Sequence, residues 1–185
     1  SVYRSRDKAR SWELVGRATY TLQMPWPEDF LWQREPFMCV MPNQAYVMCN
    51  CNRMPGDGFL RIIRSTDRGK TWEPVIKTPV WGKPAHLLPL RDGRLMMTYG
   101  YRRPPYGVRA CLSPDAGKTW DMDNEIIIRN DGGTPEGQPR KVGNSDLGYP
   151  VSVALDDRAI FTVYYFNKNG SNCFVAGTFW ELPPR

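Results

Sequence analysis

The sequence predicts an all-β protein built from repeated four-stranded antiparallel units. Three observations support this prediction. An eight-residue motif occurs twice, strand-like runs recur in the same order around both copies, and the 185-residue chain has 17 prolines and 16 glycines but no long window of helical periodicity. Hydrophobic residues make up 41% of the chain and aromatic residues 12%, which is enough to build a core.

The repeated motif is an octet, Ser-x-Asp-x-Gly-Lys-Thr-Trp, whose full copies are residues 65–72 and 113–120, 48 residues apart. A weaker copy at residues 5–12 keeps Ser, Asp and Trp but has Ala9 for Gly and Ser11 for Thr. Ser and Asp side chains can bond backbone N–H groups within a turn, Gly can take a positive φ, and Trp can cover a sheet edge. We therefore expect the octet aspartates to hold hairpin turns and to do no chemistry.

Four strand-like runs surround each full octet, three before it and one that begins at its Trp. The runs before the first octet are 37–40, 46–49 and 59–63, and those before the second are 86–88, 95–99 and 108–112, with a hairpin at Asp92-Gly93. Four strands in about 50 residues form the unit of a propeller blade. The sequence therefore predicts a β-propeller of four-stranded antiparallel blades.

The blades divide the chain, residues 1–185, as a single propeller segment. We expect residues 1–20 to supply the outer strands of one blade, residues 26–77 and 78–128 to form two complete blades, and residues 142–182 to supply the inner strands of a last one. The segment 129–147 is rich in Gly, Asn, Asp and Pro and is the longest inter-blade loop.

The net charge of +6 is compatible with an anionic partner, but no Lys/Arg run exceeds two residues and none forms a helical stripe, so we expect no nucleic-acid partner. No stretch of 18 apolar residues predicts a membrane span. The sequence lacks an initiator Met and opens within a repeat, so we interpret its N-terminus as a fragment boundary. The compartment stays open, and a secreted or periplasmic location requires a signal upstream.

Cysteine and histidine offer little for a metal site. The five cysteines are odd in number and lie in apolar, strand-like runs, which favours free buried thiols over a disulfide framework. They are Cys39, Cys49, Cys51, Cys111 and Cys173. His86 is the only histidine. We expect no metal held by Cys or His and no cofactor.

The octet resembles the Asp box of bacterial neuraminidase repeats (BNR repeats). The stretch from 146–150 through 162–165 to 176–180 is similar to the C-terminal end of sialidase-like proteins, so the resemblance covers nearly the whole chain. It implies a six-bladed propeller of which this chain holds about half, with the family's first arginine and acid/base aspartate in an N-terminal part. Asp boxes also occur in propellers that are not sialidases, so the resemblance bears on fold more than on activity.

Sialidase-type catalysis, as the resemblance implies it, uses an arginine cluster, an aspartic acid, and a tyrosine nucleophile made reactive by a glutamate. A neutral tyrosine can approach an anionic anomeric centre without like-charge repulsion. Tyr149 begins an innermost strand, where the family's nucleophile would lie, and Glu35 opens the innermost strand of an earlier blade and would face the same cavity. His86 begins an inner strand too, as a candidate cavity residue or as a structurally satisfied histidine.

Two arginines follow the second strand of successive blades, a position that converges on the propeller axis. Arg53 and Arg102 are therefore the candidates to bind a substrate carboxylate, since a planar guanidinium binds one bidentately. Arg103 and Arg109 are the register alternatives. Arg109 also aligns with Arg61 inside a third strand, which favours a shared structural role for those two.

The sequence thus predicts part of a sialidase-like, retaining exo-glycosidase that hydrolyses a terminal sugar, with an anionic sugar such as sialic acid favoured. The isolated 185 residues are expected to be inactive. The rival interpretation is a non-catalytic Asp-box propeller that binds glycan or protein. A third is a homo-oligomer in which chains assemble head to tail and complete each other's broken blade, hiding exposed strand edges.

Overall fold

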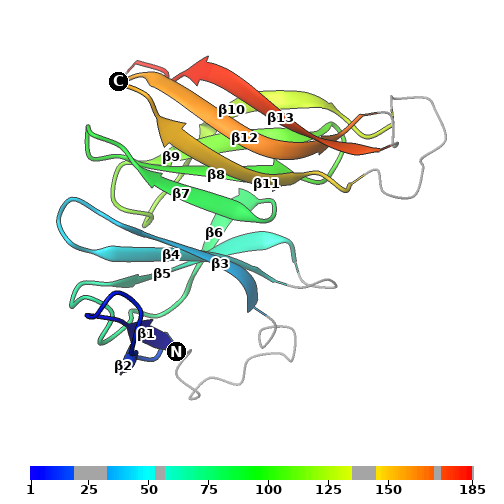
Figure 1. Ribbon diagram of the computed structural model, residues 1–185. Coiled ribbons are helices and arrows are strands. Elements are labelled where there is room, and N and C mark those ends of the chain that lie inside the picture. The colour runs from blue at the N-terminus through cyan, green and yellow to red at the C-terminus, as the bar shows by residue number, and fades with distance from the viewer. Residues whose placement is uncertain (19–32, 53–56, 135–144, 169–171, 185) are drawn as a thin grey trace.

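The computed structural model describes residues 1–18, 33–52, 57–134, 145–168 and 172–184 (Figure 1). Over these residues the regular elements are all β-strands, as the sequence predicts. No helix among them is long and apolar enough to cross a membrane. The strands form antiparallel sheets that are the blades of a β-propeller.

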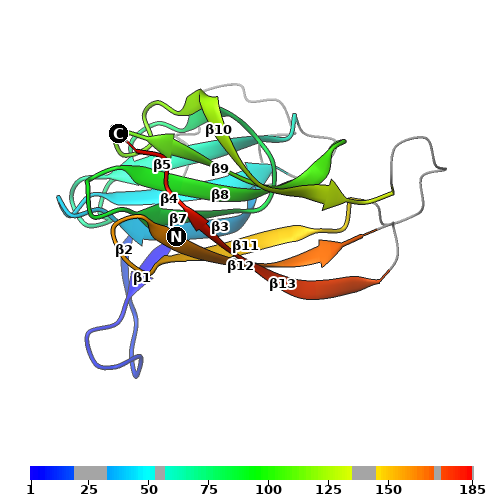
Figure 2. The same ribbon diagram turned by 90° about the horizontal axis from the view of Figure 1, so that it is seen from above.

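Thirteen strands form four sheets in the described part of the chain. The first sheet pairs β1 (Val2–Arg4) with β2 (Glu13–Gly16). The second sheet contains β3 (Gln33–Val40), β4 (Tyr46–Asn52), β5 (Phe59–Ser65) and β6 (Ile76–Trp81), and the third contains β7 (Ala85–Pro89), β8 (Leu95–Tyr101), β9 (Tyr106–Ser113) and β10 (Asp121–Gly132). The last sheet contains β11 (Gly148–Ala154), β12 (Ala159–Asn167) and β13 (Cys173–Glu181). Chain order and spatial order agree within each sheet. The innermost strands β3, β7 and β11 are neighbours across the sheets (Figure 2).

The boundaries differ from the predicted ones by a few residues. Strand β6 runs to Trp81, past the expected start of the next blade at residue 78. Pro79 lies within this strand, which is tolerated because β6 is at the edge of its sheet, where a missing N–H costs no ladder hydrogen bond. Strand β10 runs to Gly132 and so occupies the first residues of the predicted loop 129–147.

The three octets form the same turn. In each, the serine hydroxyl accepts a hydrogen bond from the backbone N–H four residues later, and the aspartate accepts one from the N–H four residues after itself. The serine bonds are Ser5–Ala9 (2.7 Å), Ser65–Gly69 (2.8 Å) and Ser113–Gly117 (2.8 Å). The aspartate bonds are Asp7–Ser11 (2.9 Å), Asp67–Thr71 (2.9 Å) and Asp115–Thr119 (2.8 Å). Gly69 and Gly117 both have φ of 87°, and Ala9 has 67° in the weaker copy.

The octet tryptophans are less equivalent than their spacing predicts. Trp120 is buried, Trp72 is half-buried and Trp12 is 61% exposed. The turn around Gly117 packs on Ile62 and Val47 of the neighbouring four-stranded sheet, whereas the described neighbour of the first full octet is the short β1–β2 pair. Less covering surface explains why Trp72 stays half-open. The strand after it begins only at Ile76, so it is not led by its Trp.

The core lies between stacked sheets. One cluster joins the second and third sheets and includes Val47, Ile62, Leu87 and Tyr99, and two smaller clusters join the third sheet to the last. Three of the described cysteines, Cys39, Cys49 and Cys111, are buried, as predicted, but Cys173 is exposed on β13. The prediction of buried thiols was wrong there because Cys173 begins the last strand, on a face that no described sheet covers.

The outward face of the last sheet is apolar and exposed. It carries Val151, Val153, Val163, Val175 and Phe179, of which the last two are 77% and 73% exposed. The same strands bury their opposite side chains against the third sheet. Exposed apolar faces of this extent mark association surfaces. The head-to-tail assembly that would cover this face stays a prediction.

Candidate functional site

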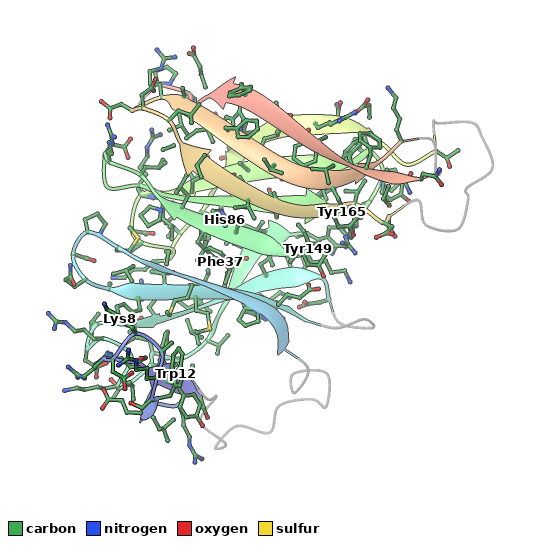
Figure 3. All side chains as sticks on the ribbon, viewed as in Figure 1. Lys8, Trp12, Phe37, His86, Tyr149 and Tyr165 are labelled. Carbon is green, nitrogen blue, oxygen red and sulfur yellow. The ribbon has the colours of Figure 1, made fainter. Side chains whose placement is uncertain are left out.

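Glu35 and Tyr149 meet at the end of the sheets opposite the octets. Strands β3 and β4 are joined by the hairpin at 41–45, which lies beside the octets, and Glu35 is at the other end of β3. The Tyr149 hydroxyl donates a hydrogen bond to Glu35 Oε1. Tyr149 stands in β11, so the two predicted catalytic residues come together from the innermost strands that flank β7. Figure 3 shows Tyr149 and Tyr165 at this end, with Phe37 and His86 farther toward the octet end.

Glu35 and Tyr149 both have a positive φ, which is unusual inside a β-strand. Glu35 has φ of 54° and Tyr149 has φ of 49°. The β3–β4 register shifts between Arg34 and Phe37, and the β11–β12 register shifts between Gly148 and Val151. A positive φ is costly for bulky side chains, and a bulge of this kind turns a side chain toward a new direction. The pairing of β7 with β8, the corresponding strands of the blade between them, has no such shift.

A close approach of two backbones lies beside Tyr149. A Cβ atom added to Gly148 would lie 3.0 Å from the Cα of Gly100, and one added to Gly100 would lie 2.9 Å from the Cα of Gly148. Glycine at both positions lets the third sheet and the last sheet touch through their main chains. This contact brings Arg102, which follows β8, next to the residues that precede β11.

Arg102 is oriented at two points. Its Nε donates to the carbonyl of Leu147 at 2.8 Å, and its Nη2 donates to the Tyr165 hydroxyl at 2.9 Å. The Tyr165 hydroxyl in turn donates to Asp146 Oδ1 at 2.6 Å. The Arg102 Cζ lies 5.8 Å from the centre of the Tyr149 ring. One predicted carboxylate-binding arginine therefore stands beside the Tyr149–Glu35 pair.

Arg61 and Arg109 differ from Arg102 in what holds them. Arg61 pairs with Asp57 at 2.8 Å and Arg109 pairs with Glu125 at 2.5 Å, and both are largely buried. Their charges are thus balanced by carboxylates of their own blades, as expected of structural residues. Arg102, by contrast, forms no ion pair with any residue that the structure describes.

The remaining candidates lie elsewhere. Arg103 is exposed, and its guanidinium stacks 3.6 Å above the Trp81 ring on β6, toward the second sheet rather than the last. His86 is buried with its ring centre 4.3 Å from that of Phe37, and its Nδ1 accepts a hydrogen bond from the Ser152 backbone N–H at 3.4 Å. Burial lowers the pKa of His86 to about 4, so it is neutral near pH 7. Arg53 lies outside the described residues.

Tyr165 was not singled out by sequence reasoning. Its neighbour Tyr164 is buried in the opposite direction and hydrogen-bonds Thr178, so alternation along β12 points Tyr165 to the outward face. A tyrosine on a face that otherwise carries Val163 and Phe161 was the available signal. The described residues contain no group of three or more His, Cys, Asp or Glu side chains that could hold a metal ion.

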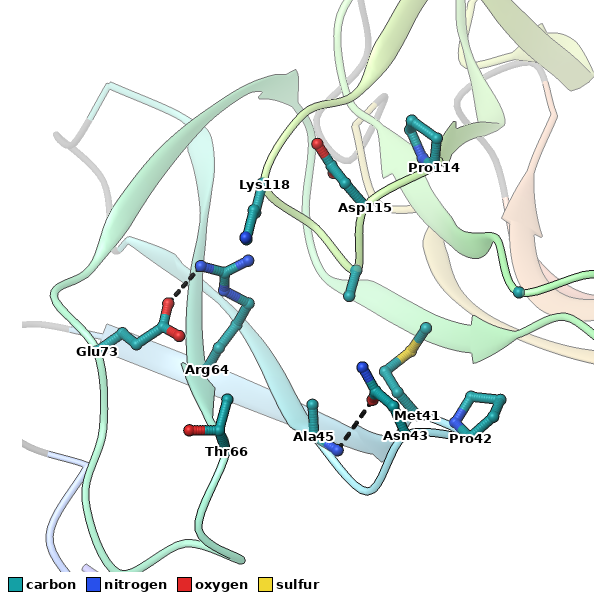
Figure 4. Close-up of a pocket in the computed structure, with 12 residues that line it drawn as sticks. Met41, Pro42, Asn43, Ala45, Arg64, Thr66, Glu73, Pro114, Asp115 and Lys118 are labelled. Atoms are coloured by element: carbon teal, nitrogen blue, oxygen red, sulfur yellow. Dashed lines mark hydrogen bonds and ion pairs between the residues drawn. The ribbon is translucent and has the colours of Figure 1, made fainter.

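An open groove of about 490 Å³ lies at the octet end, between the 41–45 hairpin and the second full octet (Figure 4). Its charged side chains include Arg64, which pairs with Glu73, and Asp115, which is bonded within its own turn. The positive φ angles at this groove, at Gly93 and Ala116, belong to hairpin and octet turns, and neither interrupts a strand as those of Glu35 and Tyr149 do. We therefore take the Tyr149 end as the candidate site.

No protein-family model and no curated protein matches the chain. Among solved structures, a protein of unknown function from Dyadobacter fermentans is 29% identical with a TM-score of 0.73, over 98% of this chain and 45% of that one. A GH93 α-L-arabinofuranosidase of Fusarium graminearum, solved with arabinobiose, is 13% identical with a TM-score of 0.59, over 83% of this chain and 47% of that one. An α-L-arabinanase of Penicillium chrysogenum, also solved with arabinobiose, is 15% identical with a TM-score of 0.52, over 90% of this chain and 52% of that one.

These likenesses support the propeller fold. The chain spans about half the length of each of these three solved structures. The more specific resemblance to sialidases stays a prediction.

Proposed function

We propose that this chain carries part of the active site of a propeller glycoside hydrolase, in which Tyr149 is the nucleophile and Glu35 is its base. The observation that carries the proposal is the hydrogen bond from Tyr149 to Glu35, made by two residues with positive φ at bulges in different blades. Backbone strain of this kind costs about 1–3 kcal/mol at each residue and clusters at functional sites. The fold neighbours that are glycosidases make the same class of reaction the natural hypothesis.

The chemistry follows from the direction of that hydrogen bond. Glu35 takes the phenolic proton while Tyr149 Oη bonds to the anomeric carbon and the glycosidic C–O bond breaks. The leaving oxygen takes a proton from an acid, for which the sialidase resemblance implies an aspartate outside this sequence. Water then cleaves the glycosyl–tyrosine bond, and two inversions give net retention.

Arg102 favours an anionic sugar. Its guanidinium is held beside the Tyr149 ring by a carbonyl and a phenol, so its positive charge is not cancelled by a described carboxylate. A bidentate contact with a sugar carboxylate would use that charge. We propose a terminal sialic acid or a related acidic sugar as the substrate. A neutral furanoside, as in the arabinofuranosidase neighbour, is the competing substrate class.

The test uses the full-length protein with an aryl sialoside and an aryl α-L-arabinofuranoside. Tyr149→Phe should reduce turnover on the order of 10³-fold or more and leave stability nearly unchanged, because only the nucleophilic hydroxyl is lost. Tyr46→Phe, at the octet end, is the matched control and should leave turnover unchanged. Mass spectrometry should detect a glycosyl adduct on Tyr149 with a fluorinated substrate.

Full turnover by Tyr149→Phe would show that the nucleophile is misassigned. Cleavage of the arabinofuranoside alone would keep the hydrolase and remove the anionic substrate. If the wild-type protein binds glycans and cleaves none of them, the non-catalytic glycan-binding propeller should replace the enzyme.

A further inference from the structure

Hydrogen bonds link three side chains, Asp146, Tyr165 and Arg102, beside Tyr149. Arg102 Nη2 donates to the Tyr165 hydroxyl at 2.9 Å, and that hydroxyl donates to Asp146 Oδ1 at 2.6 Å. The Tyr165 and Tyr149 rings lie 5.7 Å apart between their centres (Figure 3). Tyr165 therefore contacts both the orienting carboxylate and the arginine that faces the proposed nucleophile.

The direction of these bonds is fixed by chemistry. A guanidinium can only donate, so the Tyr165 oxygen accepts from Arg102 and its single proton goes to Asp146. Burial, together with the hydrogen bond to Asp146, raises the pKa of Tyr165 above its ordinary value, so the phenol stays neutral at ordinary pH. A neutral group thus separates the carboxylate from the guanidinium.

This arrangement differs from those of Arg61 and Arg109, which lie in the third strands of the two four-stranded blades. Arg61 and Arg109 contact Asp57 and Glu125 directly, which fixes them but also balances their charge. Arg102 is held by hydrogen bonds to the Tyr165 hydroxyl and the Leu147 carbonyl, and no described carboxylate forms an ion pair with it. Orientation without neutralisation is what a binding site for an anion requires.

We propose that Tyr165 is a positioning residue that fixes the Arg102 guanidinium beside Tyr149 for a substrate carboxylate. The proposal rests on the proposed function. It predicts that the Tyr165 hydroxyl affects substrate binding through Arg102 and does not take part in bond making or breaking.

The test compares Tyr165→Phe with Tyr164→Phe in the full-length protein. Both variants lose one hydroxyl from β12, but that of Tyr164 points to the opposite face and pairs with Thr178. The first readout is nuclear magnetic resonance of the Arg102 side chain, whose guanidinium should rotate freely in Tyr165→Phe and remain restricted in Tyr164→Phe. The second is kinetics on an aryl sialoside and on its uncharged methyl ester.

We expect Tyr165→Phe to raise KM for the sialoside roughly tenfold with kcat little changed, and to leave KM for the ester unaltered. Unchanged Arg102 mobility in Tyr165→Phe would overturn the proposal whatever the activity. The proposal would also be overturned if Tyr165→Phe made the Arg102 guanidinium mobile but left KM for the sialoside unaltered, provided that Arg102→Lys raises that KM. If Arg102→Lys has no effect either, the anionic substrate of the proposed function fails, while the mobility measurement still decides the role of Tyr165.

Discussion

Positive φ angles occur at both ends of these sheets, but they follow different rules. At the octet end they recur in each copy of the motif, at Lys8 and Ala9, Arg68 and Gly69, and Ala116 and Gly117. At the other end two non-glycine residues inside strands have them, Glu35 and Tyr149, and the described strands of the blade between these two have no counterpart. A conformation that repeats with the fold serves the fold. One that breaks the repeat needs a different explanation, and here the two exceptions contact each other.

The charged groups at the two ends differ in the same way. The side-chain and backbone hydrogen bonds from Thr71 lower the pKa of Asp67 to about 2, and Arg64 at that end is paired with Glu73. At the site end, Arg102 is oriented by neutral groups. The proposed function therefore places stability and catalysis at opposite ends of the strands, and substitutions at the two ends should separate the two effects in measurements.

The largest expected effect belongs to the octet end. Trp120→Ala should lower the free energy of unfolding by about 3–5 kcal/mol, because a buried aromatic side chain leaves a cavity. Trp72→Ala should cost only roughly 1–2 kcal/mol, because Trp72 is half-buried. Urea unfolding measures both. Equal losses would show that the two octets contribute equally despite their different neighbours.

The close approach behind Tyr149 gives the next largest effect. Gly148→Ala should cost about 1–3 kcal/mol and lower turnover, since φ is 123° and the new Cβ would press on Gly100. Gly93→Ala is the control: φ is 89° there, but no atom lies within 4 Å of the added Cβ. It should cost less and leave turnover intact. Urea unfolding and initial rates measure both variants. A larger loss of stability or turnover in Gly93→Ala than in Gly148→Ala would contradict the role given to the close approach.

A smaller effect should appear in the pH dependence of the octets. The pKa of Asp67 is about 2 in the folded chain against 3.8 for an ordinary aspartate, so its contribution to stability is full above pH 4 and disappears as the pH falls toward 2. Asp67→Asn should therefore lower Tm at pH 6 and match the wild type near pH 2. The exposed Asp123→Asn should track the wild type throughout. A Tm difference for Asp67→Asn that persists unchanged at pH 2 would exclude this linkage.

The sequence was sufficient for the blades because their determinants are local. Octet turns depend on residues four apart, and strands on alternation, so both can be detected without knowing the packing. The predicted strand boundaries were wrong where packing between strands and sheets determines them. Strand β6 continues through Pro79 because it is an edge strand, and Trp72 is only half-buried because the described sheet beside it is the two-stranded β1–β2 pair.

The candidate site was only partly accessible to sequence reasoning. Glu35 and Tyr149 could be named from their places at the starts of innermost strands, yet nothing local predicts bulges that turn them toward each other across 114 residues. Choosing Arg102 over Arg103 depended on which sheet each faces. Tyr165 was missed because its role requires a contact with Arg102 from another blade.

The smallest effect on stability, and the most discriminating, comes from replacing strained residues with glycine. Ala9 has φ of 67° in the decayed octet and Glu35 has φ of 54° in the site. At either position glycine relieves the strain of a left-handed backbone but adds flexibility to the unfolded chain, so we expect a gain of roughly 0.5–1 kcal/mol. Ala9→Gly should raise Tm slightly and leave turnover of the full-length protein unchanged.

Glu35→Gly should raise Tm by a similar amount and abolish most turnover, because the proposed base is lost while its backbone keeps its preferred conformation. Glu35→Gln, which retains the strain and the shape but not the charge, should lose turnover without the gain in Tm. Differential scanning calorimetry and initial rates measure both quantities. A large drop in Tm for Glu35→Gly would show that the Tyr149–Glu35 bond holds the blades together, and the strain at this end would then belong to the fold, as it does in the octets.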